Sequence, residues 1–129
     1  MSVQLNHLIV WCNDPEASSK FYARILGLRA PETFAHFKVV RADNAVSLDF
    51  MLKEDGKVAG QHYAFLVDEA QFDLVLGRIR AEGVKHWADP GQSKPNEINH
   101  HDGGRGVYFV DPNGHLLEIL TRPYGSGSA

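Results

Sequence analysis

The chain has 129 residues, the length of one typical domain. Hydrophobic residues make up 43% and charged residues 22%, which excludes a wholly disordered chain. The formal charge of −3, without a basic block, argues against nucleic acid or an anionic membrane as main partner. No apolar run reaches the ~20 residues of a membrane span. The N-terminus lacks a secretory leader pattern and Cys12 is the single cysteine, so we expect a cytoplasmic protein without an internal disulfide.

The first half of the chain predicts a strand, a helix and three short strands. Residues 5–11 are rich in β-branched and aromatic side chains, which favour a strand. Asp14 as N-cap and Pro15 at the first helical position predict a helix that Gly27 ends. Strands are then expected around residues 28–33, 37–41 and 46–52, followed by a loop over residues 53–61.

The second half restarts the same order. A strand is expected over residues 62–67, a helix from Asp68 to Gly83, and a short strand over residues 84–87. A polar loop over residues 89–104 precedes a hairpin of residues 105–110 and 115–121 around the turn Asp111-Pro112-Asn113-Gly114. The tail, residues 125–129, is expected to be disordered.

The two halves overlay as an internal repeat. Its modules cover about residues 4–53 and 62–122 within a single domain of residues 1–124. The overlay places His7 on His62 and Asp49 on Glu118. Matching histidines and matching acids are the most informative feature of the sequence.

Glu118 lies between Leu116 and Leu120 on one face of its expected strand. Burying a carboxylate costs several kcal/mol unless a cation or partner compensates it. Two histidines and one carboxylate suit a divalent Zn, Mn, Fe, Co or Ni ion and leave positions open for a substrate. Asp49 is either a fourth ligand or an acid that hydrogen-bonds beside the site.

Each of these residues also has a structural interpretation. Taken singly, His7 and His62 read as surface histidines and Glu118 as an ion-pair partner. His100 and His101 lie in the polar loop, either as a solvated pair or as a mobile acid/base or substrate contact. Aromatic residues either line an apolar pocket or fill the core: Trp11, Phe37, Phe50, Tyr63, Trp87 and Tyr108.

The residues resemble the vicinal oxygen chelate superfamily, which includes glyoxalase I, extradiol dioxygenases, fosfomycin-resistance thiol transferases and bleomycin-binding proteins. The resemblance covers roughly residues 4–122 and rests on these segments: Leu5-Asn6-His7-Leu8, Asp14-Pro15, Phe21-Tyr22, Leu26-Gly27-Leu28, His62-Tyr63-Ala64-Phe65 and Tyr108-Phe109-Val110-Asp111-Pro112-Asn113-Gly114-His115-Leu116-Leu117-Glu118. It implies an α+β fold of two βαβββ modules that form a cupped, barrel-like mixed sheet. It also implies a homodimer and a divalent metal ion held by His7, His62 and Glu118.

Branch markers of the family are incomplete in this chain. Asp49 stands where the glyoxalase I pattern has Glu. Ile9 stands where fosfomycin transferases carry Thr, and Arg122 is the near candidate for their basic residue beyond the last Glu. His100 or His101 matches the further catalytic histidine of extradiol dioxygenases only loosely.

Two functions follow as hypotheses. The first is a metal-dependent enzyme of lyase, dioxygenase or thiol-transferase type, whose small substrate chelates the metal through adjacent oxygens. Its expected catalytic residues are Glu118, Tyr108, His100 and His101, and its expected substrate contacts are Ile9, Trp11, Asp49, Met51, Tyr63, Tyr108 and Arg122. The alternative is a metal-free resistance protein that sequesters an aromatic antibiotic or natural product at the dimer cleft.

Overall fold

The computed structural model describes residues 2–127 and divides into two compact units, Met1–Ala59 and Gly60–Ala129. Each unit contains one four-stranded sheet and one helix in the order βαβββ, which confirms the predicted α+β class and the repeat. The described strands form two separate sheets, β1-β4-β3-β2 and β5-β8-β7-β6. No strand pairing joins the two mixed sheets within residues 2–127, so they are not closed into a barrel.

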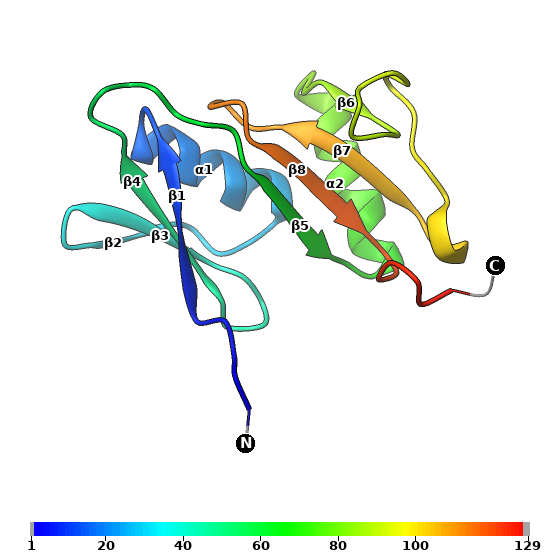
Figure 1. Cartoon of the computed structure of the whole chain (residues 1–129), viewed down its shortest axis with the longest axis horizontal. Coiled ribbons are helices and arrows are strands. Elements are labelled where there is room, and N and C mark those ends of the chain that lie inside the picture. The colour runs from blue at the N-terminus through cyan, green and yellow to red at the C-terminus, as the bar shows by residue number, and fades with distance from the viewer. Residues whose placement is uncertain (1, 128–129) are drawn as a thin grey trace. The chain divides into compact units, whose positions relative to one another are not determined.

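The first unit has β1 and β4 as parallel neighbours, with the remaining pairs antiparallel (Figure 1). Its elements are β1 (His7–Cys12), α1 (Pro15–Leu26), β2 (Glu32–Phe34), β3 (Phe37–Arg41) and β4 (Ser47–Leu52). The predicted strand over residues 28–33 is shorter and begins later. Pro31 lacks the N–H that a paired strand position needs, so pairing begins only after it.

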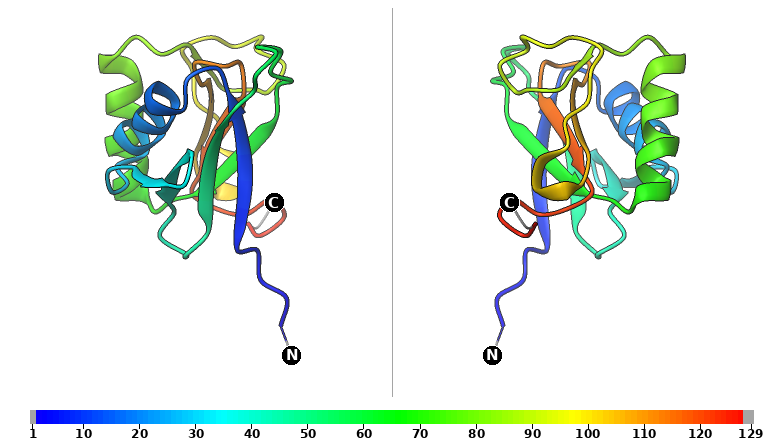
Figure 2. Two further views of the ribbon diagram at one scale, coloured as in Figure 1. Left: turned by 90° about the vertical axis from the view of Figure 1, so that its left-hand side faces the viewer. Right: turned by 90° about the vertical axis from the view of Figure 1, so that its right-hand side faces the viewer.

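Helix α1 begins and ends as its sequence predicts. The Asp14 carboxylate accepts a hydrogen bond from the Ala17 N–H, and Gly27 takes the left-handed conformation at φ 72°. The helix covers one face of the first sheet (Figure 2). The rings of Tyr22 and Phe50 meet edge to face there, with centroids 4.8 Å apart.

The second unit repeats this plan, with β5 parallel to β8. Its elements are β5 (His62–Leu66), α2 (Glu69–Ala81), β6 (His86–Trp87), a 3₁₀ turn (His101–Gly103), β7 (Gly106–Val110) and β8 (Leu116–Leu120). Helix α2 buries an apolar side over the sheet (Figure 1). The buried core residues are Phe72, Val75, Leu76 and Ile79 of the helix and Val107, Phe109, Leu117 and Ile119 of the strands.

Strand pairing puts the repeated residues at matching positions. His7 pairs with Ser47 and Ile9 with Asp49, while His62 pairs with Leu116 and Ala64 with Glu118. Side chains alternate between faces, so His7 and Asp49 lie on the face of their sheet opposite α1. His62 and Glu118 lie on the face opposite α2. We call these surfaces the non-helical faces.

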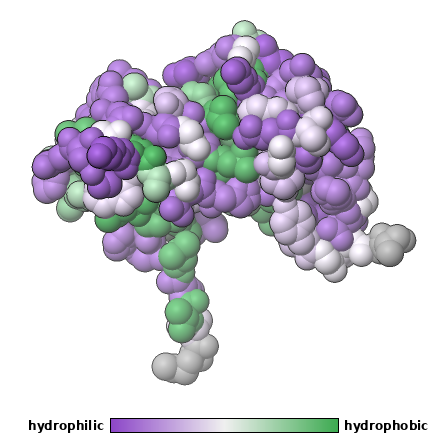
Figure 3. Space-filling view, turned by 45° about the horizontal axis from the view of Figure 1, so that its top comes forward, coloured by the Kyte–Doolittle hydropathy of each residue, from purple (hydrophilic) through white to green (hydrophobic). Residues whose placement is uncertain are grey.

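The two ends of the described chain differ. The segment before β1 is extended, and Val3 and Leu5 expose 103% and 65% of their surface; hydrophobic colour marks this arm in Figure 3. The Gly127 N–H donates to Asp102 Oδ1 at 3.4 Å and the Ser126 N–H donates to the Pro123 carbonyl, while disorder of the tail over residues 125–129 stays a prediction. Residues 128 and 129 lie outside the described residues. No helix in residues 2–127 has the length and apolar content to cross a membrane.

Phe50→Ala should lower the free energy of unfolding by about 3–5 kcal/mol, because it removes a fully buried ring from beneath α1. Leu52→Ala is the matched control on the same strand, since Leu52 is 50% exposed and its loss should cost less than about 1 kcal/mol. Urea denaturation followed by circular dichroism measures both. Equal costs for the two variants would contradict this packing.

Candidate metal centre

Glu118 is a carboxylate buried in the second sheet. It is 1% exposed and comes from the middle of β8. Its strand neighbours are Ala64 on β5 and Tyr108 on β7. With apolar residues on either side along β8, the charge needs compensation from polar groups or a cation.

His62 supplies one such group. Its Nδ1 lies 2.9 Å from the carbonyl oxygen of Leu116, and its Nε2 lies 3.1 Å from Glu118 Oε1. A carbonyl oxygen only accepts, so Nδ1 carries a proton and donates it. In the neutral ring, the Nε2 lone pair would then face a carboxylate oxygen. Either a proton on Nε2 or a cation bound by both groups removes this repulsion.

Tyr124 holds the other oxygen of the carboxylate. Its hydroxyl donates to Glu118 Oε2 in a short hydrogen bond, and it lies 2.8 Å from the Tyr108 hydroxyl. Because Tyr124 has one hydroxyl proton and gives it to Glu118, Tyr108 is the donor in the tyrosine pair. The Tyr108 ring stacks on the His62 ring, with centroids 5.9 Å apart. Because Tyr108 donates its proton to Tyr124, the lone pairs of its oxygen stay available to accept a further hydrogen bond.

Both tyrosines are neutral phenols. Burial raises the pKa of Tyr108 above its ordinary value, against a lowering by its hydrogen bond with Tyr124. Burial also raises the pKa of Tyr124, and its hydrogen bond to Glu118 raises it further. The two hydroxyls thus keep their protons at neutral pH and act as a fixed donor chain that ends on Glu118.

The His62–Glu118 pair fits a divalent metal ion. Two adjacent ligand atoms, each ~2.1 Å from an ion, lie ~3 Å apart, and Nε2 and Oε1 are 3.1 Å apart. The Nδ1–H bond to a backbone carbonyl is the usual support of a metal-bound histidine. Within residues 2–127, no cluster of three or more His, Cys, Asp or Glu side chains forms a complete metal site. The pair therefore supplies two ligands, and a third is needed.

The first unit carries the other predicted ligand, His7, at the start of β1. Its Nδ1 lies 2.8 Å from Asn6 Oδ1, an acceptor, which leaves Nε2 for another partner. Ile9, Trp11, Asp49 and Met51 share its non-helical face. Ile9 and Trp11 are 42% and 38% exposed, so they offer apolar surface beside the histidine.

Several predicted residues lie elsewhere. Tyr63 points to the opposite face from His62, where its ring meets His115 at 5.6 Å, because neighbouring strand residues alternate. Phe50 is core for the same reason. Arg122 donates to the Ser126 carbonyl at 3.3 Å. The rings of His100 and His101 make no hydrogen bond or ion pair to a described residue.

Tyr124 is the site residue that the sequence analysis missed. It follows the last strand, in a segment with no periodic pattern, and 59% of its surface is exposed. The only signal in the sequence was an aromatic residue with a hydroxyl six positions beyond Glu118.

Comparisons with known proteins match this chain to a family model and to several similar proteins. The family model described as Glyoxalase/Bleomycin resistance protein/Dioxygenase superfamily matches residues 4–119. The structure of Oxidase ChaP-H1 is 60% identical, covers 96% of this chain and 99% of its own, and has a TM-score of 0.93. The structure of Oxidase ChaP-H2 is 56% identical, covers 99% of this chain and 100% of its own, and has a TM-score of 0.95. Metallothiol transferase FosB of Shouchella clausii (strain KSM-K16) is 28% identical over 91% of this chain and 79% of its own.

Tyr124→Phe should weaken divalent metal binding about 10-fold or more, because the Glu118 carboxylate loses the donor that orients it. Competition titration with Co²⁺ against a chromophoric chelator measures the affinity. Tyr63→Phe is the matched control, since that phenol lies on the other face of the sheet. Equal affinities in the two variants would show that Tyr124 does not orient Glu118.

Proposed function

We propose that this chain, which belongs to the glyoxalase/bleomycin resistance protein/dioxygenase superfamily, is a metal-dependent oxidase of a small substrate with two adjacent oxygens. The family match confirms the resemblance drawn from the residues. The observation that carries the oxidase proposal is the likeness to two proteins named oxidases, at 60% and 56% identity over nearly the whole of each chain. Dioxygen is the oxidant that we assign to the reaction.

The metal ligands in this proposal are His7, His62 and Glu118. Two histidines and one carboxylate with open positions are the ligand set of non-haem Fe(II) oxygenases, so we propose iron. When bound, the ion supplies Lewis-acid positions for the two substrate oxygens and one-electron chemistry toward dioxygen. His7 comes from the first unit, and we expect the working form to be a homodimer, as the resemblance implies.

The residues of the second unit prepare the site before any substrate arrives. The Leu116 carbonyl fixes the His62 ring so that Nε2 is the ligand atom. Tyr124 occupies Oε2 of Glu118, which leaves Oε1 beside His62 Nε2 as the ligand oxygen. Tyr108 donates its proton to Tyr124, so its oxygen accepts a hydrogen bond from a substrate hydroxyl. A hydroxylated aromatic substrate satisfies this acceptor.

The proposed substrate is aromatic because apolar side chains flank the predicted ligands. Ile9 and Trp11 follow His7 on the same face of β1, with Asp49 and Met51 beside them on β4. Flat rings bind well against such exposed aromatic and aliphatic surface. Asp49, opposite Ile9, would accept from a second hydroxyl of the substrate.

The metal-free alternative is sequestration of an aromatic drug without turnover. Exposed Ile9 and Trp11 favour it as well. A buried carboxylate aligned with an imidazole at 3.1 Å favours the enzyme, because an apolar drug gains nothing from a buried charge. A thiol-transferase reaction, as the name of FosB indicates for that relative, has weaker support from a relative at 28% identity.

Metal content tests the ligand set. Protein purified without a histidine tag should hold about one iron or other divalent ion per chain after reconstitution. His7→Ala, His62→Ala and Glu118→Ala should each lose it, while His36→Ala, an exposed histidine outside the predicted set, should keep it. Elemental analysis measures the content, and failure of the native protein to take up Fe, Mn, Co, Ni or Zn would contradict the proposal.

Oxygen consumption tests the reaction. An oxygen electrode should record iron-dependent uptake with members of a panel of catechols, hydroquinones and hydroxyketones. Tyr108→Phe should lower kcat/KM by about 10-fold or more on a hydroxylated substrate, since one polar contact is lost. Tyr63→Phe serves as control. Tight binding of aromatic antibiotics to the metal-free protein, with no oxygen uptake from any substrate, would favour sequestration instead.

A further inference from the structure

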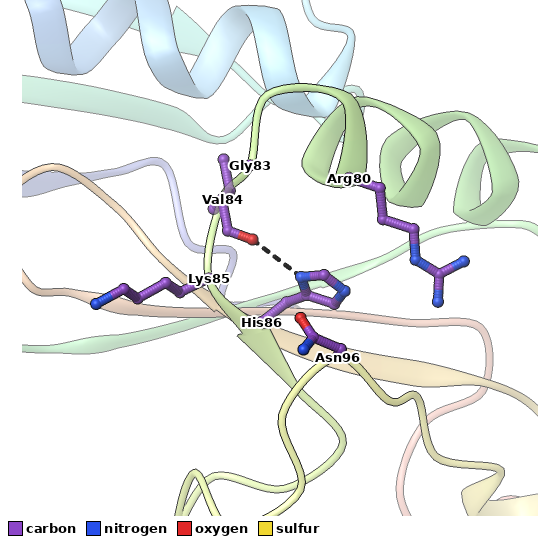
Figure 4. A pocket seen from close by; sticks show the side chains of 6 residues that line it. All are labelled: Arg80, Gly83, Val84, Lys85, His86 and Asn96. Atoms are coloured by element: carbon purple, nitrogen blue, oxygen red, sulfur yellow. Dashed lines mark hydrogen bonds between the residues drawn. The ribbon is translucent and has the colours of Figure 1, made fainter.

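A pocket lies in the second unit, away from the tyrosine network. It has a volume of about 370 Å³ at the end of α2, where the chain enters β6 (Figure 4). The lining residues are Arg80, Gly83, Val84, Lys85, His86 and Asn96. Trp87 pairs with Tyr108, so the preceding His86 points to the other face of the sheet. The pocket is therefore distinct from the candidate metal centre.

His86 brings an unpaired polar atom into this pocket. The residue is 6% exposed, and its Nδ1 lies 2.9 Å from the Val84 carbonyl, to which it donates. Its Nε2 is buried and has no hydrogen-bond partner among residues 2–127. A buried ring nitrogen without a partner is costly, so a ligand that pairs with this atom would remove that cost.

The charges around His86 favour an anion. Arg80 and Lys85 are exposed and form no ion pair with any residue in the described part of the chain, and none of the six lining residues is acidic. Arg80 extends from α2 on one side of the His86 ring and the Asn96 side chain lies next to the ring, whereas Lys85 extends away (Figure 4). Lys85 thus contributes charge at longer range, and Arg80 and Asn96 contribute donors.

The nearby helix end does not oppose an anion strongly. The carbonyls of Arg78, Ile79 and Arg80 accept hydrogen bonds from the N–H groups of Glu82, Val84 and Gly83. Paired carbonyls carry less exposed negative charge than free ones. The backbone N–H of Asn96 donates to the His86 carbonyl at 2.8 Å, which holds the Asn96 backbone beside β6.

We propose that this pocket is a binding site for a small oxyanion of the phosphate class. A protonated His86 donates from Nε2, and the Arg80 guanidinium and the Asn96 amide donate to the remaining oxygens. Arg80 is exposed, so it closes over the anion without unpacking the core. A neutral hydroxyl ligand would satisfy Nε2 alone and would leave both cations without a counter-charge.

The probe for the test is inorganic phosphate, titrated at constant ionic strength into ¹⁵N-labelled protein. Saturable shifts should appear in the amides of residues 80–96, and the Nε2 resonance of His86 should move to the protonated position. Arg80→Gln should weaken binding about 10-fold or more, while Arg29→Gln, which removes an exposed cation of the first unit, should not change it. Site-resolved shifts separate this site from any phosphate bound at a metal ion.

Two further variants and two competing anions complete the phosphate-binding test. Asn96→Ala changes an exposed side chain, so it keeps the test valid if His86→Gln fails to fold. Sulfate should compete with phosphate, and acetate should compete more weakly because it is planar and singly charged. Shifts that grow linearly with phosphate, that are equal in Arg80→Gln and Arg29→Gln, or that leave Nε2 unprotonated would overturn the site. Loss of oxidase activity in any variant has no bearing on this readout.

Discussion

The buried charge of Glu118 constrains the rest of the second unit. A carboxylate at 1% exposure in the middle of an apolar strand costs several kcal/mol unless other groups compensate it. Three side chains from three separate segments form the network around it: His62 from β5, Tyr108 from β7 and Tyr124 from beyond β8. The strand order β5-β8-β7 is what allows this, because it puts β8 between the two strands that carry the neighbours.

The donor and acceptor of each hydrogen bond around Glu118 can be assigned, which gives the network a direction. The Leu116 carbonyl takes the His62 Nδ1 proton, and Glu118 takes the Tyr124 proton. Tyr124 in turn takes the Tyr108 proton. Each of these three protons is therefore committed, and the acceptors left include the His62 Nε2 lone pair, Glu118 Oε1 and the Tyr108 oxygen. The first two suit a metal ion and the third suits a substrate hydroxyl, so one network prepares both partners of the proposed reaction.

The features that depend on the internal repeat or on local helix signals were predictable from the sequence. The repeat placed His7 with His62 and Asp49 with Glu118, and the strand register gives the same positions. Helix α1 followed from Asp14, Pro15 and Gly27, whose effects are local. Tyr124 could not be predicted, because its role depends on a contact made by an irregular segment. Tyr63 is adjacent in sequence to the predicted ligand His62, but strand alternation turns its ring to the other face, where it meets His115.

The two repeats also differ in a way that assigns them unequal work. In the second sheet, the acid lies between Ala64 and Tyr108; in the first, Asp49 lies between Ile9 and Val39. Val39 has no hydroxyl, so the first sheet offers its acid no counterpart of the Tyr108–Tyr124 chain. A small Ala64 leaves room beside Glu118, whereas Ile9 presents apolar surface beside Asp49. Both halves of the repeat therefore contain a histidine, His7 and His62. Of the two matching acids in the described part of the chain, only Glu118, in the second half, is held by hydrogen bonds from neighbouring side chains. Within residues 2–127, the second unit alone therefore holds a buried carboxylate whose orientation is fixed by hydrogen bonds from neighbouring side chains.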